Sequence, residues 1–185
     1  MGLGIAYAMG AFDSRGRIAA EDVCAHTPDR GKVAGTLESA LPQAASYSFR
    51  ERWSPGKDMD FRSSCSVRGD GDILLMLTAE PNTVSTWSDW QEYAVEPEDR
   101  RGLSRFTAGK HAVANTGVAA LAVPCSLYAG MKGVPLYLTV VAQAGKPLEV
   151  PDGEARSVLV RLATDYARQA HKDARCTLPS RLPEG

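Results

Sequence analysis

The most regular pattern in the sequence is EARSVLVRLATDYARQAHKDARC, residues 154–176. Apolar side chains recur in it at intervals of three and four residues, which predicts one long helix with a single buried face. The members of this face are Ala155, Val158, Leu159, Leu162, Ala163, Tyr166, Ala167 and Ala170. Asp152 is a suitable N-cap, and Lys172 and Arg175 suit the dipole of the helix C-terminus. Such a helix needs a layer to cover, and it ends beside Cys176.

Most of the chain before this helix has the pattern of β-strands joined by turns. The apolar run ILLMLTAE at 73–80 predicts a buried strand, joined by a Gly-Asp turn at 69–72 to a strand at 64–68. Further strands are expected at 46–53, 104–114, 117–124 and 135–143, and shorter helices at 18–25, 29–41 and 86–95. Because no strand–helix–strand alternation occurs, we expect an α+β fold: an antiparallel sheet of about six strands covered on one face by helices.

The four cysteines, Cys24, Cys65, Cys125 and Cys176, lie far apart in the sequence. An even number at wide spacing in a Gly- and Pro-rich domain favours two structural disulfides and an oxidising compartment outside the cytosol. Buried inert thiols are the alternative, and zinc is disfavoured because no two cysteines have the short spacing of metal ligands. We favour the sequential pairing, Cys24 with Cys65 and Cys125 with Cys176, although sequence does not determine connectivity.

Length and charge limit the domain organisation and the partners. The 185 residues suit one globular domain, expected at 18–179, with a Pro-containing tail at 180–185 that frays. Lys and Arg number 21 against 22 Asp and Glu, and this balance argues against a general nucleic-acid binder. The run LGIAYAMGAF at 3–12 is too short to cross a bilayer. Residues 1–17 are therefore interpreted as the remnant of a membrane anchor or as a packed N-terminal segment.

The sequence predicts no catalytic residue, cofactor or metal site. It has no phosphate-binding glycine loop, no G-x-S-x-G and no H-E-x-x-H. The alternative is an enzyme of unfamiliar type in which His111 or His26 acts with carboxylates.

One aromatic cluster is the candidate ligand or partner surface. In the expected helix at 86–95, Trp87, Trp90 and Tyr93 share a face, and the charged loop after it supplies Arg100 and Arg101. Exposed Trp and Tyr provide large contact area at low entropic cost. Packing of these aromatic side chains in the core is the alternative. A second candidate is the basic face of the last helix, for an anionic lipid or cell-wall surface, with a solvated face as its alternative.

Several short segments of the sequence resemble those of a group of known proteins. They are Asp22-Val23-Cys24, Leu41-Pro42, Ser64-Cys65-Ser66-Val67, Val123-Pro124-Cys125 and the Ala-rich final helix running into Cys176-Thr177-Leu178-Pro179. In these features the chain resembles uncharacterised exported or membrane-anchored envelope proteins of Streptomyces-like actinobacteria. The resemblance implies a cell-envelope α+β domain with paired cysteines and carries over no functional residue.

The expected function is accordingly that of a non-enzymatic, extracytoplasmic binding or interaction domain, attached to the membrane through its N-terminus. Its expected partner is an envelope protein, a lipid or a cell-wall component.

Overall fold

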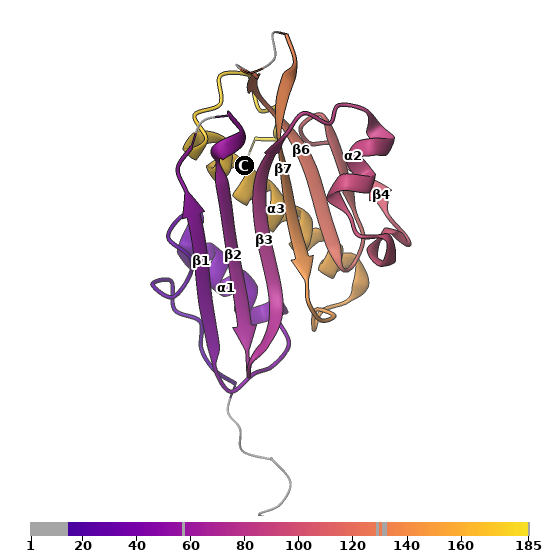
Figure 1. Ribbon diagram of the computed structural model, residues 1–185. Coiled ribbons are helices and arrows are strands. Elements are labelled where there is room, and N and C mark those ends of the chain that lie inside the picture. The colour runs from indigo at the N-terminus through magenta and orange to yellow at the C-terminus, as the bar shows by residue number, and fades with distance from the viewer. Residues whose placement is uncertain (1–14, 57, 129, 131–132, 185) are drawn as a thin grey trace, which may run out of the picture.

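The computed structural model describes residues 15–56, 58–128, 130 and 133–184, and its centre is a seven-stranded antiparallel sheet (Figure 1). The strands are β1 (Tyr47–Ser54), β2 (Arg62–Gly69), β3 (Asp72–Asn82), β4 (Ser104–Arg105), β5 (His111–Ala114), β6 (Val118–Leu127) and β7 (Pro135–Ala144). Their order is β1-β2-β3-β7-β6-β5-β4, so β7 joins the two hairpin-rich halves. The predicted fold class, α+β with an antiparallel sheet, is confirmed.

Helices lie on both sides of this sheet. α1 (Arg30–Ala40) and α3 (Asp152–Asp173) lie behind it in Figure 1, where α3 packs on β3, β5, β6 and β7. The short α2 (Trp87–Ala94) lies on the opposite face, chiefly against β6 and β7, and its two tryptophans also pack on His111 of β5. The second face is therefore covered over one half and open over β1, β2 and β3. We call it the open face.

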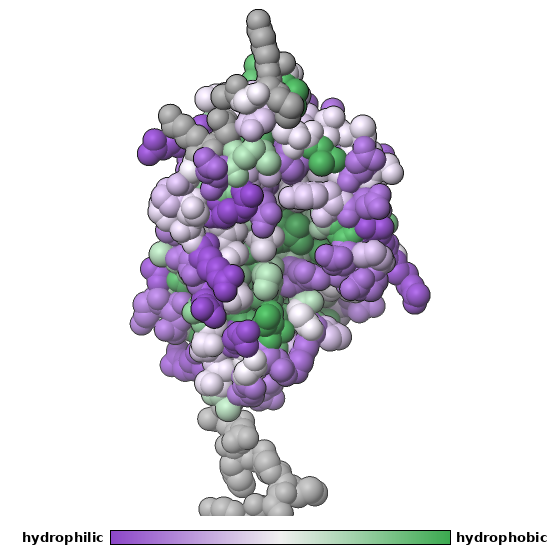
Figure 2. All heavy atoms as spheres, in the orientation of Figure 1, coloured by the Kyte–Doolittle hydropathy of each residue, from purple (hydrophilic) through white to green (hydrophobic). Residues whose placement is uncertain are grey.

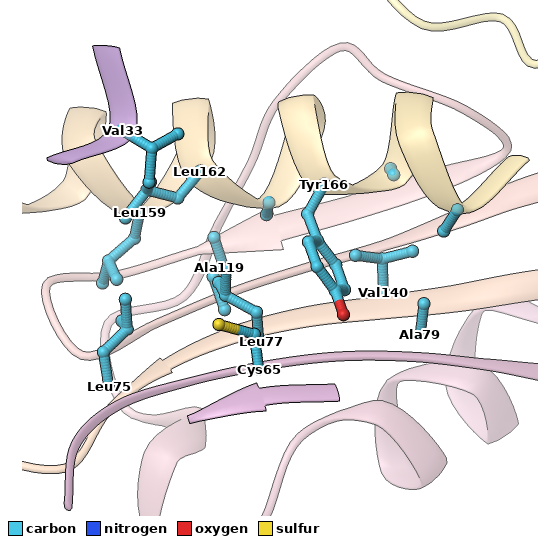
Figure 3. Packing of buried hydrophobic residues seen from close by; sticks show 14 of the residues in the cluster. Val33, Cys65, Leu75, Leu77, Ala79, Ala119, Val140, Leu159, Leu162 and Tyr166 are labelled. Atoms are coloured by element: carbon cyan, nitrogen blue, oxygen red, sulfur yellow. The ribbon is translucent and has the colours of Figure 1, made fainter. Parts of the chain in front are cut away.

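The main core lies between α3 and the sheet (Figure 3). Leu159, Leu162 and Tyr166 point from α3 toward side chains of β3, β6 and β7, among them Leu77 and Val140. Every predicted member of the apolar face of α3 is buried. Alternation along β2 and β3 sends one set of side chains to this core and the other set to the open face.

Two disulfides fix the ends of the chain to the sheet. Cys24 is bonded to Cys65 of β2, and Cys125 of β6 is bonded to Cys176 after α3. A bulge between Pro124 and Ser126 allows a proline inside β6. The predicted sequential pairing is confirmed, and the disulfides indicate an oxidising, extracytoplasmic compartment. Within the described ranges, no helix is both long and apolar enough to span a bilayer.

Three local predictions are corrected. The expected helix at 18–25 consists of turns, because Asp22 bonds the backbone of Ala19 and Cys24 has to reach β2. The expected strand at 104–114 is two strands, β4 and β5, which raises the strand number to seven. Between them Gly109 has a φ of +57° and lies so close to Ala122 that a Cβ would clash.

The tail is the third correction, since 180–184 is held to the domain. The Gly109 N–H donates to the Arg181 carbonyl at 2.9 Å, and the Arg168 guanidinium donates to the Pro183 carbonyl at 3.0 Å. Both contacts join segments that lie apart in the sequence, so local sequence patterns do not predict them. The apolar run at 3–12, interpreted as a remnant of an anchor, lies outside the described residues.

Tyr166 links α3 to β2, and from the environment of its hydroxyl we predict a loss of stability at alkaline pH. Its hydroxyl lies 2.6 Å from Ser63 Oγ, and burial raises the pKa of Tyr166 to about 12. A tyrosine in the unfolded chain ionises near pH 10, so between about pH 10 and pH 12 only the unfolded state loses this proton. The free energy of unfolding should fall by roughly 2 to 3 kcal/mol across that window. Urea unfolding on both sides of it checks this, and Tyr166→Phe should flatten the fall.

Candidate functional site

The open face contains a groove between the sheet and the chain around α2. Its volume is about 300 Å³. The floor comes from β3, β6 and β7, and the wall from the end of α2 and the residues after it. The lining residues are Thr78, Glu80, Tyr93, Ala94, Val95, Glu96, Asp99, Val118, Thr139, Val141 and Gln143. Figure 2 shows this side of the molecule, with green apolar atoms in the hollow next to α2.

The groove is acidic and has one aromatic side chain at its wall. Glu80, Glu96 and Asp99 are its three carboxylates, and Gln143 Nε2 donates to Asp99 Oδ2 at 2.7 Å. Tyr93 is 49% exposed, so its ring is accessible to a ligand. Burial raises the pKa of Tyr93, the charge of Glu80 raises it further, and Arg62 of β2 opposes the rise. The hydroxyl therefore remains a neutral donor and acceptor at physiological pH.

The structure divides the predicted aromatic cluster. Trp90 is fully buried, and its Nε1 donates to Thr139 Oγ1 at 3.0 Å, so its assignment to a contact surface is wrong and the core alternative holds. Tyr93 lines the groove. Trp87 and Arg100 border a separate hollow of about 170 Å³ on the outer side of α2.

The rest of the predicted cluster is occupied with local contacts. The Arg100 guanidinium donates to the carbonyls of Val95 and Glu92, which fixes the turn after α2 (distances 2.9 and 3.0 Å). Arg105 lies 3.8 Å from the centre of the Trp87 ring, a cation–π contact. Arg101 is exposed beyond the groove. Of the five predicted residues, Tyr93 alone lines the groove of the open face.

His26 has a carboxylate partner, whereas His111 has none among the described residues. His26 Nδ1 lies 3.1 Å from Glu51 Oε1, and the ring stacks on Trp53 with centroids 4.3 Å apart. Glu51 also accepts from the backbone N–H groups of Ala25 and His26, so it holds the turn next to Cys24. His111 Nε2 lies 3.0 Å from the Ser85 carbonyl and its ring packs on two tryptophans. The predicted pairing of His111 with a carboxylate is not found there.

Other chemistry-bearing groups have structural partners. Within the described ranges, no three His, Cys, Asp or Glu side chains are grouped as metal ligands would be. His171 Nε2 lies 3.1 Å from the Pro124 carbonyl and 3.0 Å from that of Leu178, beside the second disulfide. On the basic face of α3, Arg168 bonds Asp165 and Arg161 lies near Thr36 of α1.

A second feature of the open face was missed from the sequence. Every second residue pair between β1 and β2, on the side of the open face, joins one serine with one arginine: Ser48 with Arg68, Arg50 with Ser66, Arg52 with Ser64, and Ser54 with Arg62. We call these eight residues the Arg–Ser ladder. All four arginines are exposed, and in Figure 2 purple side chains cover this part of the face. The alternation at 48–54 was a visible signal, but the rungs depend on a pairing register that sequence does not give.

Comparison of the chain with protein-family models, with curated proteins and with solved structures finds no match, so the site is interpreted from its own geometry.

Proposed function

We propose that this protein is an extracytoplasmic, non-enzymatic binding domain that contacts a component of the cell envelope through its open face. The observation that carries the proposal is the asymmetry of the sheet: α1 and α3 seal one face, while the other keeps a groove of about 300 Å³ beside α2. Binding sites are concave and place a few polar groups beside an apolar or aromatic contact surface, and this groove offers carboxylates and threonines beside one accessible aromatic ring. The disulfides and the resemblance to exported envelope proteins support the location, and attachment through residues 1–17 belongs to the same proposal.

The groove favours binding over catalysis because of the side chains that line it. Carboxylates, threonines, one glutamine and one tyrosine provide hydrogen bonds and charge, and among the described residues the lining includes no His, Cys or Lys that would act as a nucleophile or base next to them. The enzyme alternative rests on His26 and Glu51. Both oxygens of Glu51 already hold backbone groups, and the nearby hollow of about 270 Å³ is lined by Trp53 and Asp173 but not by His26.

A sedimentation assay tests the proposal with two probes, insoluble cell-wall sacculi and vesicles of phosphatidylcholine and phosphatidylglycerol. We expect the wild-type protein to pellet with one of them, and Thr78→Trp, which fills the groove floor, to reduce the bound fraction at least about fivefold. Tyr93→Ala should also weaken binding. Ser157→Trp, on the exposed side of α3, is the matched control and should bind like wild type. Equal binding by Thr78→Trp and Ser157→Trp would contradict the groove as the site.

A further inference from the structure

The Arg–Ser ladder concentrates positive charge on one part of a chain whose net charge is close to zero. The chain carries a net charge of −1, yet the open side of β1 and β2 presents four arginines and four serines and no carboxylate. In the described part of the chain, none of the four arginines is in an ion pair. Their guanidinium groups are therefore available to interact with solvent or with an external anion.

The geometry of the ladder is linear. Side chains on one face of a strand repeat every two residues, about 7 Å, so the four rungs form a line of roughly 20 Å. Arg68, Arg50, Arg52 and Arg62 follow along this line in rung order, at one arginine per rung. Arg62 and Arg68 are steadied by bonds of 2.7 to 2.8 Å to backbone carbonyls of Met59, Phe61 and Gly71. Arg50 and Arg52 are the central pair, flanked by the small Ser64 and Ser66.

The nearby acidic groups do not cancel this charge. Asp72 is paired with Lys146, whose hydrogen bond holds the pKa of that carboxyl below its usual range, with Arg68 adding to the effect. Glu80 lines the groove, where its charge raises the pKa of Tyr93 and the charge of Arg62 lowers it. On the neighbouring strands, the pairs of Arg50 and Arg52 continue to Ser66 and Ser64 of β2 and then to Met76 and Thr78 of β3, and all four of these residues are uncharged.

We infer that the Arg–Ser ladder binds a linear polyol phosphate polymer, whose phosphodiester groups repeat along an extended chain without nucleobases, since the ladder has no aromatic side chain on which bases could stack. The inference rests on the proposed role of the open face and names its ligand class. Guanidinium groups bind phosphate through two parallel hydrogen bonds, and serine hydroxyls add donors between them. A line of charges one rung apart fits a chain of repeating anions better than a single ion. The ladder has no large apolar side chain to insert between lipids, which disfavours a membrane surface.

A structural role for these arginines predicts a different behaviour. β1 is one of the two edge strands of the sheet, and charged side chains on an edge oppose pairing with a second molecule. If that were their role, neutral substitutions would cause dimerisation or aggregation and leave anion binding unchanged. The test has to measure both properties.

The test compares two charge-matched variants of the whole protein. In the first, Arg50→Gln with Arg52→Gln removes the central pair; in the second, Arg161→Gln with Lys172→Gln removes the same charge from the exposed side of α3. The probe is a synthetic oligo(glycerol phosphate), with binding followed by fluorescence anisotropy at several salt concentrations. The first variant should bind at least about tenfold more weakly, and its slope of log affinity against log salt should fall by roughly two. The α3 variant should bind like wild type, and Arg50→Lys with Arg52→Lys should retain part of the affinity.

Several results would overturn the inference. Equal affinity of the two Gln variants would do so, as would dimerisation of the Arg50/Arg52 variant without loss of affinity, which assigns the arginines to edge protection. Tighter binding to a single-stranded oligonucleotide or to phosphatidylglycerol vesicles than to the phosphate polymer would assign another partner. If Tyr93→Ala weakens pelleting with sacculi while wild-type protein still binds sacculi stripped of phosphodiester polymers, the groove proposal stands and the ladder inference fails.

Discussion

Replacing Trp90 by alanine should lower the free energy of unfolding by about 3 to 5 kcal/mol. The ring is completely buried between α2 and the sheet, in a small cluster with Val95, Val113 and Ala120. The substitution leaves a cavity and removes the indole bond to Thr139, which then keeps only the amide of Asn82 as a donor. Urea unfolding followed by circular dichroism measures the change.

Two controls separate volume from hydrogen bonding at this position. Trp90→Phe keeps most of the apolar contact and loses the indole N–H, so we expect a loss of only about 1 to 2 kcal/mol. Trp87→Ala, at a half-buried ring, should cost less than Trp90→Ala. A Trp90→Ala protein as stable as wild type would show that the ring is not packed in the core. It would also reopen the aromatic-surface hypothesis.

The second large effect is expected from removing the disulfide between Cys125 and Cys176. The two residues are separated by 51 positions in the sequence. In the chain-entropy model, a loop of this length contributes about 4 kcal/mol, because the bond restricts the unfolded chain. The double variant Cys125→Ser with Cys176→Ser leaves no odd thiol and should lose about that amount under oxidising conditions.

Reduction provides the control for this prediction. In reducing buffer, the free energy of unfolding of the wild-type protein should lose the contributions of both disulfides. That of the double variant should lose the contribution of Cys24–Cys65 alone. Peptide mapping of unreduced protein should recover the two linked pairs. Unchanged stability of the double variant would contradict the stabilising role, and four free thiols in the mapped protein would contradict both that role and the oxidising compartment.

The sequence predicted well those features that depend on local periodicity. The apolar stripe of α3 needs only its own spacing, and the N-cap at Asp29 is visible in the chain, where its side chain accepts from the Lys32 N–H. The Asp70-Gly71 turn also follows from local chemistry, since both residues have positive φ. The sequential cysteine pairing is confirmed, although the sequence favoured it without determining it.

Features that depend on tertiary placement could not be predicted. Periodicity assigns Trp90 to a face of α2, but not to the side of the sheet on which α2 lies. The groove combines side chains of β3 and β7, which neighbour each other only because β7 enters the middle of the sheet. The Arg–Ser ladder requires the register of β1 and β2. The break between β4 and β5 follows from the close approach of Gly109 to Ala122, and strand propensity carries no information about it.

The placement of the two disulfides has a mechanical consequence. One covalent loop contains α1 and β1 with the first part of β2, and the other contains β7 and α3. If the two ends of the protein were pulled apart, these loops could not lengthen, and β3, α2, β4, β5 and most of β6 would supply most of the extension. A domain working at a surface under tension would thus extend mainly through its central segment, while β1 stayed within a covalently closed loop.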